Sequence, residues 1–208
     1  MIKNLLLAAL LSVPAAAQEG DATLAKVAGH VTIGGGSATR YKAKGGEPLL
    51  YGDSVRTGPG AVAQVLLKDR GAVLIHENTF FVLSGSPRRT LLDFARGEFL
   101  IGLKKKLDKG MSFKVRTPAA VAAVRGTLFW GKTDKDKTTT YAGFGHRIEV
   151  TAKGKTVAVE AGQTLTVPFG QPPSDASSHD IPLSYMERFH VNGSLQGLEA
   201  LADLPKKE

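Results

Sequence analysis

The sequence predicts an all-β domain, either a short-stranded β-solenoid-like stack or a sandwich, with a small helical appendage at its C-terminus. Two observations lead to this prediction. The 208 residues include 24 glycines spaced at short intervals, and the runs between them alternate apolar and polar side chains with a period of two. Alternation of this kind places one set of side chains on a buried face and the other toward solvent. Many short strands joined by glycine turns are typical of sandwiches, barrels and solenoids.

The alternating runs cover most of the chain. The clearest of them occupy residues 61–68, 99–104 and 112–117, and shorter ones follow at residues 148–150, 157–159 and 165–167. A helical period appears only near the C-terminus, where Pro182 suits the first turn of one short helix and Ser194 can cap a second. We expect the apolar stripe of this segment to dock on its own domain.

The first seventeen residues have the layout of a secretory signal peptide. Lys3 gives a basic start, an apolar run extends from Leu5 to Ala17, and Ala15 and Ala17 are the small residues that a signal peptidase reads. The run is shorter than the roughly 20 residues that span a bilayer, and no later stretch is apolar enough to do so. We therefore expect cleavage after Ala17 and a periplasmic or secreted protein without a transmembrane span.

Composition shifts suggest four segments. A signal peptide (1–17) precedes a β domain (18–170), and a polar linker (171–179) with Pro172 and Pro173 precedes a helical segment (180–208).

The composition excludes several kinds of chemistry. The chain has no cysteine, which rules out thiol catalysis, zinc fingers, iron–sulfur clusters, disulfides and a lipid-anchored N-terminal cysteine. No two of the five histidines have the spacing that directs two imidazoles at one metal, and neither a nucleophile elbow nor a phosphate loop is present. We therefore predict a non-enzyme with no cofactor and no metal. The enzymatic alternative, an unrecognised envelope hydrolase, requires clustered carboxylates in a cleft.

The net charge is +8 and becomes +7 once Lys3 is removed with the signal peptide. For an exported protein, anionic glycans, lipid headgroups and acidic proteins are better counterparts than nucleic acid, and the basic runs lack the aromatic residues that stack on bases. Convergent cations raise the local concentration of anions. The predicted anion- or partner-binding residues are Lys104, Lys105, Lys106, Lys109, Arg88 and Arg89.

Several phrases, taken in order, resemble one known module. They are GDSVRTG at residues 52–58, VLLKDRG at 65–71, LLDFARGE at 91–98, FKVRTP at 113–118 with VRGTLF at 124–129, and VAVEAGQ at 157–163. Together they resemble the FecR domain, found in periplasmic parts of iron-transport regulators and in other exported proteins. The resemblance runs from about Val27 to Val167.

The resemblance implies an all-β fold and a role in sensing or binding rather than catalysis. The expected function is that of an exported, non-catalytic module that binds a cell-envelope component, either a protein or an anionic glycan. The alternative is a periplasmic regulatory or signalling protein related to iron-transport sensing, although a leading signal peptide would keep the chain away from a cytoplasmic sigma factor. We expect the motif residues to act structurally: Gly52, Asp53, Thr57, Gly58, Thr117, Pro118, Arg125, Gly126, Thr127 and Gly162.

Overall fold

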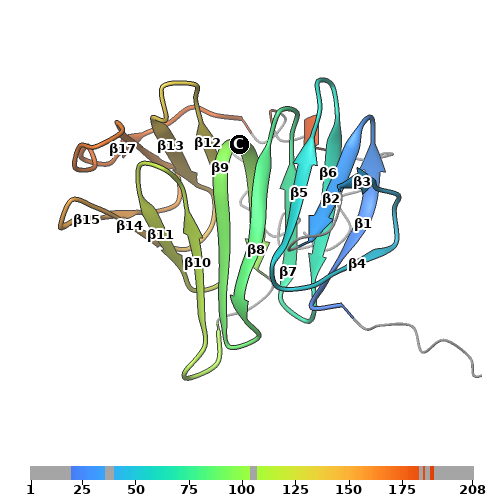
Figure 1. Cartoon of the computed structure of the whole chain (residues 1–208). Helices are drawn as coiled ribbons and strands as arrows, with labels where there is room; N and C mark the ends of the chain where they lie inside the picture. The colour runs from blue at the N-terminus through green and yellow to red at the C-terminus, as the bar shows by residue number, and fades with distance from the viewer. Residues whose placement is uncertain (1–19, 36–39, 104–106, 183–184, 186–187, 190–208) are drawn as a thin grey trace, which may run out of the picture.

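A computed structural model describes residues 20–35, 40–103, 107–182, 185 and 188–189. These residues form seventeen strands (Figure 1), which confirms the all-β prediction. Within this part of the chain, no helix is long and apolar enough to cross a membrane.

The strands make two layers, sheet A and sheet B, that share the long strand β9 (Arg89–Leu103). Both sheets are open at their edges. Sheet A has the order β4 (Glu47–Leu49), β1 (Ala22–Ala28), β6 (Val62–Leu67), β7 (Gly71–Ile75), β9, β12 (Leu128–Thr133), β13 (Thr139–Gly143), β16 (Gln163–Val167) and β17 (Ser177–Ser178). Sheet B has the order β3 (Tyr41–Lys42), β2 (Val31–Gly35), β5 (Asp53–Thr57), β8 (Phe80–Ser86), β9, β10 (Ser112–Arg116), β11 (Val121–Val124), β14 (Ile148–Ala152) and β15 (Lys155–Val159).

The chain passes back and forth between the layers. The hairpin β6–β7 lies in sheet A, β8–β9 in sheet B, β10–β11 in sheet B, β12–β13 in sheet A, β14–β15 in sheet B and β16–β17 in sheet A. Pairings between strands are antiparallel, with the exception of β9 with β10. The arrangement therefore combines the two architectures predicted, a sandwich whose successive hairpins are stacked along one axis.

Strand β9 changes sheets at Gly97. Its first half pairs with β8 and its second half with β7 and β12. Gly97 has φ +100°, and a Cβ atom there would lie 2.4 Å from the Cα of Thr79. The hydroxyl of Thr79 accepts the Glu98 amide hydrogen at 3.0 Å. Only glycine fits this corner, because the backbone is left-handed and Thr79 occupies the adjacent space.

The core lies between the sheets, and a series of aromatic rings crosses it. Phe81 of β8 stacks on Phe94 with a centroid distance of 5.1 Å, Phe94 stacks on Phe99 at 4.2 Å, and Phe99 meets Phe129 edge-on at 6.1 Å. Because Phe94 and Phe99 lie on either side of the Gly97 corner, the series joins sheet B to sheet A. These rings are almost completely buried.

The outer face of sheet A is also buried, in its middle, by the C-terminal segment. Ile181 and Phe189 pack there against a second apolar cluster that includes Leu74, Leu100 and Trp130. The segment therefore docks on its own domain. In the described part of residues 180–208, residues 185 and 188–189 have 3₁₀-helical conformation, and the expected helical appendage is not shown beyond them. The segment expected to form the second helix lies outside the described residues. Within the expected linker, Ser177–Ser178 pairs with β16 and Pro173 is buried.

Candidate functional site: a pocket with a basic rim

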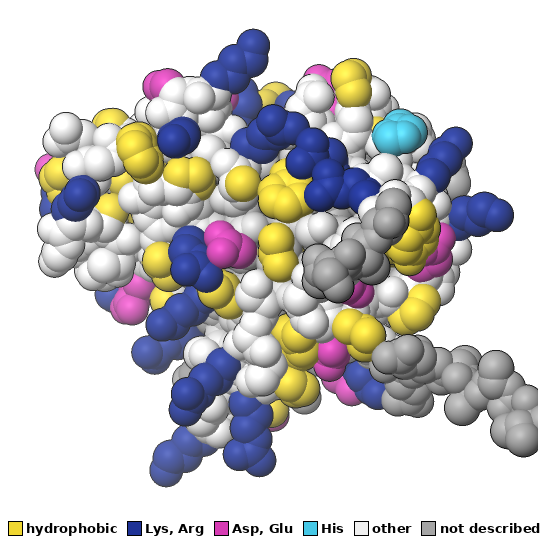
Figure 2. Space-filling view, viewed as in Figure 1, with side chains coloured by type: hydrophobic (Ala, Val, Ile, Leu, Met, Phe, Trp, Pro, Cys, Tyr) yellow, Lys and Arg dark blue, Asp and Glu magenta, His cyan; other side chains and the backbone are white. Residues whose placement is uncertain are grey.

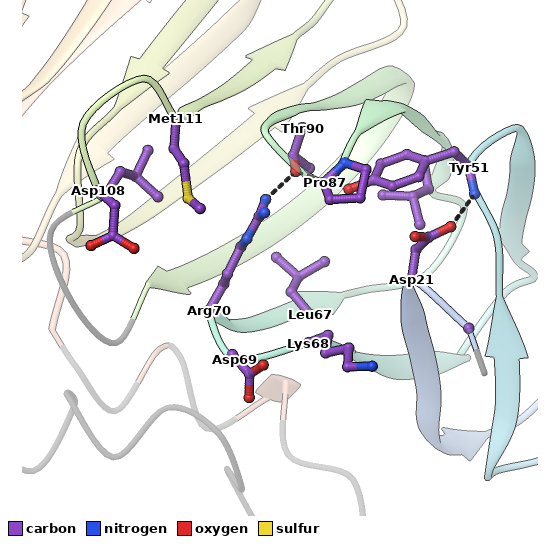
Figure 3. A pocket seen from close by; sticks show the side chains of 13 residues that line it. Asp21, Tyr51, Leu67, Lys68, Asp69, Arg70, Pro87, Thr90, Asp108 and Met111 are labelled. Carbon is purple, nitrogen blue, oxygen red and sulfur yellow. Dashed lines mark hydrogen bonds between the residues drawn. The ribbon is translucent and has the colours of Figure 1, made fainter.

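A pocket of about 530 Å³ opens at one end of the sandwich, where four turns meet. Tyr51 comes from the turn between β4 and β5, Arg70 from the β6–β7 turn, and Thr90 from the start of β9. The fourth contribution, from residues 107–111, precedes β10 (Figure 3). Leu67, Leu83, Leu107 and Met111 give the pocket an apolar part. The site is thus assembled from segments far apart in the sequence.

Hydrogen bonds to Thr90 organise one wall of the pocket. The guanidinium of Arg70 donates to Thr90 Oγ1, and the hydroxyl groups of Tyr51 and Thr90 lie 3.2 Å apart. Asp21 holds the backbone of Tyr51 in this wall, because its carboxylate accepts the Tyr51 amide hydrogen at 3.1 Å (Figure 3). Arg70 stands between the Asp and the Gly of the expected β6–β7 turn, and the sequence alone did not indicate its place in a pocket.

The pocket contains both signs of charge. Lys68 and Arg70 are accompanied by Asp21, Asp69 and Asp108. The three aspartates stand on separate parts of the wall and do not face one another (Figure 3). Paired carboxylates that face a common substrate, as glycoside hydrolysis requires, are therefore not what this pocket presents.

Three of the predicted basic residues are sequence neighbours of residues that line this pocket. Arg88 is exposed in the β8–β9 turn and Arg89 is exposed at the start of β9, beside the lining residues Pro87 and Thr90. Lys109 is exposed beside Asp108. Two contacts bring the two turns together: the Ser112 amide donates to the Arg88 carbonyl at 2.9 Å, and Ser112 pairs with Arg89 in the parallel register of β9 and β10. We call Arg88, Arg89 and Lys109 the basic rim. Lys104, Lys105 and Lys106 lie outside the described residues.

The first group of FecR-like motif residues forms turns around β5. Asp53 closes the turn after β4, since its carboxylate accepts the Leu50 amide hydrogen at 2.8 Å and its own amide donates to the Leu50 carbonyl at 3.0 Å; Gly52 in this turn has φ +103°. Thr57 is buried at the other end of β5, where its hydroxyl donates to the His76 carbonyl at 2.6 Å. The Gly58 amide donates to the His30 carbonyl at 2.8 Å.

The second group lies in the C-terminal half. Thr117 and Pro118 begin the β10–β11 turn, in which the Thr117 amide donates to the Ala120 carbonyl at 2.9 Å. Gly126, with φ +94°, and Thr127 make the passage from sheet B to sheet A, and the Thr127 hydroxyl donates to the His146 carbonyl at 2.7 Å. Arg125 is exposed beside them.

The last of these residues, Gly162, has φ +77° and stands before β16. Its amide donates to the Gly143 carbonyl at 2.9 Å. Both groups of motif residues, with Gly162, therefore sit at turns and inter-sheet passages.

A polar cluster that the sequence did not reveal lies at the opposite end, on the outer face of sheet A. Glu98 is buried and accepts hydrogen bonds from Trp130 Nε1 at 2.6 Å and from Arg188. His76 has its Nδ1 4.0 Å from Glu98 Oε2 and its ring edge-on to Phe189. Sequence motifs could not reveal this cluster, because Glu98 and Arg188 are ninety residues apart in the chain.

Comparisons with known proteins agree with the motif reading. Residues 53–163, more than half of the chain, match the model of the FecR protein family. Two crystal structures of a proposed anti-sigma factor from Parabacteroides distasonis, at 2.50 and 1.65 Å resolution, are similar in fold, each with a TM-score of 0.54 and 20% sequence identity.

Each of these alignments covers 61% of this chain and 60% of that protein, so less than two thirds of the relative's length is represented here. No curated protein matches the sequence. On the extent of the family match, this chain belongs to the FecR family.

Proposed function

We propose that this protein is a regulatory component of the cell envelope that acts by binding another protein at the pocket with the basic rim. The proposal is supported by the backbone contacts that bring the segment carrying Arg88 and Arg89 next to the segment carrying Lys109, beside a pocket with an apolar part. Exposed cations steer an acidic partner, and a concave apolar surface holds it.

Family membership supports a regulatory role over the simpler expectation of envelope binding. The chain belongs to the FecR family, and the solved structures of similar fold are described as anti-sigma factors. An anti-sigma factor, as its name states, acts on another protein, so this likeness favours a protein partner. Export to the envelope is part of the proposal, and it rests on the signal peptide that the sequence predicts at residues 1–17.

The mixed charge of the pocket favours a protein partner over an anionic glycan. Asp21, Asp69 and Asp108 would repel a chain of uniformly negative sugars. A peptide carries both signs and apolar side chains, so it can satisfy the rim, the aspartates and the leucines together.

Site-specific photocrosslinking tests this proposal. A photoreactive phenylalanine analogue replaces Met111 in the pocket wall, and in a matched control it replaces Lys153, exposed in the β14–β15 turn at the other end of the sandwich. After irradiation in intact cells, we expect one protein to be crosslinked from position 111 and not from position 153. Equal labelling from both positions, or crosslinks to glycan alone from position 111, would overturn the proposal.

A further inference from the structure

A row of side chains crosses the outer face of sheet B away from the pocket. The register pairs Thr32 of β2 with Arg56 of β5, Arg56 with Phe80 of β8, and Phe80 with Arg96 of β9. Residues paired across strands point to the same face. A β-bulge places Arg96 in this row, because the register shifts by one residue between Phe80 and Phe81 just before the Gly97 corner.

A third arginine reaches the row over a glycine. The side chain of Arg40 crosses Gly34, where a Cβ atom would lie 3.4 Å from Arg40 Nε. Its guanidinium carbon lies 5.8 Å from the centre of the Phe80 ring, and that of Arg56 lies 5.0 Å from it. Two guanidinium groups therefore meet at one half-buried aromatic ring, with Arg96 beside it.

The three charges have no counter-ion within the described part of the chain. No ion pair is formed by Arg40, Arg56 or Arg96 there, and the buried Nε of Arg56 and Oγ1 of Thr32 have no hydrogen-bond partner. The pKa of Arg56 is lowered, first by burial and then by the positive charges of Arg40 and Arg96.

The adjacent row of the same face differs. It runs through Ser54 and Val82 to Asp93, which forms an ion pair with Arg116 at 3.0 Å. Basic side chains are also prominent elsewhere on the face that Figure 2 shows. The row around Phe80 differs from its neighbour because its positive charges have no acidic partner among the described residues.

We propose that Arg40, Arg56, Arg96 and Phe80 form a second binding site, which takes an acidic segment of a protein with an apolar side chain between its carboxylates. The guanidinium fork matches a carboxylate with two parallel hydrogen bonds. Phe80 lies between Arg56 and Arg96 across the strands. We therefore expect the bound segment to carry an apolar side chain, which packs on Phe80, between the two carboxylates that pair with the arginines. This site is separate from the pocket and does not depend on its proposed role.

Fluorescence anisotropy with a labelled peptide, in which glutamate and leucine alternate on one face, tests the inference. We expect the full chain to bind this peptide at low salt, and Arg56→Gln and Arg96→Gln each to weaken binding about tenfold, the effect of losing one charged hydrogen-bonded pair. Phe80→Ala should also weaken binding. Lys114→Gln, which removes one exposed charge from β10 on the same face, should leave it unchanged.

Competition separates the possible ligands. Polygalacturonate or inorganic phosphate that displaced the peptide as effectively as unlabelled peptide would overturn the assignment to a protein segment. Absence of peptide binding, or an equal loss with Lys114→Gln, would overturn the site itself. The basic-rim variant Arg88→Glu should bind the peptide normally, so this test and that of the proposed function can fail independently.

Discussion

The indole Nε1 of Trp130 donates a hydrogen bond to Oε1 of Glu98 at 2.6 Å on the outer face of sheet A, and the same carboxylate receives Arg188 from the C-terminal segment. Glu98 is only 6% exposed. The guanidinium carbon of Arg188 lies 3.4 Å from the centre of the Tyr185 ring, and burial lowers the pKa of Arg188 to about 10, so the group stays charged at neutral pH. The contact fastens the end of the chain to the sheet.

Replacement of Glu98 should be costly. Glu98→Ala leaves the charge of Arg188 and the indole N–H of Trp130 without their buried partner, and we expect the free energy of unfolding to fall by about 3–5 kcal/mol. Urea denaturation followed by Trp130 fluorescence measures it. The control is Glu149→Ala, which breaks the exposed pair with Arg147 and should cost less than about 1 kcal/mol. Equal losses in the two variants would contradict the buried role of Glu98.

The stability of the protein should decline in mild acid because of His76. The pKa of His76 is lowered by burial, then by the charge of Arg188, and Glu77 opposes these effects. Glu98 stands 4.0 Å away, too far for a hydrogen bond. Because the folded pKa lies below the unfolded value of about 6.5, the unfolded state takes up the proton first. The contribution is therefore complete above about pH 6.5 and is lost as the pH falls through the folded pKa.

Urea midpoints measured at about pH 7.5 and about pH 5.5 check this dependence. The midpoint of the natural protein should drop more between the two pH values than that of His76→Gln. The control His30→Gln changes an exposed turn residue and should keep the natural pH dependence. An unchanged pH dependence in His76→Gln would show that other groups are responsible.

Thr117 should matter for stability through its hydroxyl. That oxygen accepts the Ala120 amide hydrogen at 3.2 Å and the Thr139 hydroxyl at 3.1 Å, and it lies 3.0 Å from the hydroxyl of Tyr141, whose pKa is raised by burial. Thr117→Val keeps the shape of the side chain but leaves these groups without a hydrogen-bond partner. We therefore expect the free energy of unfolding to fall by about 1–3 kcal/mol or more. Thr117→Ser retains the oxygen and should be the milder change in the same urea titration. The opposite order would show that the β10–β11 turn depends on the methyl group of Thr117 and not on its hydrogen bonds.

The corner at Gly97 offers a test of the two-sheet path of β9. Gly97→Ala introduces strain at φ +100° and a clash with the backbone of Thr79. Gly154→Ala shares the positive φ, at +78°, but meets no atom within 4 Å. We expect about 1–2 kcal/mol for Gly154→Ala from backbone strain alone and a clearly larger loss of thermal stability for Gly97→Ala. Similar melting temperatures would mean that β9 does not turn in this way.

The strands could be predicted from local alternation, but the covering of sheet A could not. In β6, Val62 and Gln64 should face solvent by period alone, yet both are buried along with Val65 on the opposite face. The C-terminal segment helps to cover the outer face of the sheet, packing against Leu66, Leu74 and Leu100. Docking of a distant segment depends on tertiary packing, and the alternation of apolar and polar residues along a strand carries no information about it.

The candidate site could be predicted only in part, for a similar reason. Arg88 and Arg89 stand out in the sequence as neighbouring cations, but their approach to Lys109 depends on the parallel pairing of β9 with β10. Arg70 and Arg96 carry no local signal at all. Arg70 reaches the pocket from the β6–β7 turn, and a β-bulge places Arg96 on the outer face of sheet B.

The central claim, that the basic rim recruits a protein partner, is tested most directly by measuring the affinity for the partner crosslinked from position 111. Binding is compared between the triple variant Arg88→Glu, Arg89→Glu, Lys109→Glu and the control Lys132→Glu, Lys135→Glu, Lys153→Glu, which reverses three exposed charges at the opposite end of the sandwich. The rim variant should bind the partner much more weakly, and any remaining affinity should vary less with salt concentration. The control should bind as the natural protein does. Equal affinities for the two variants would contradict the central claim.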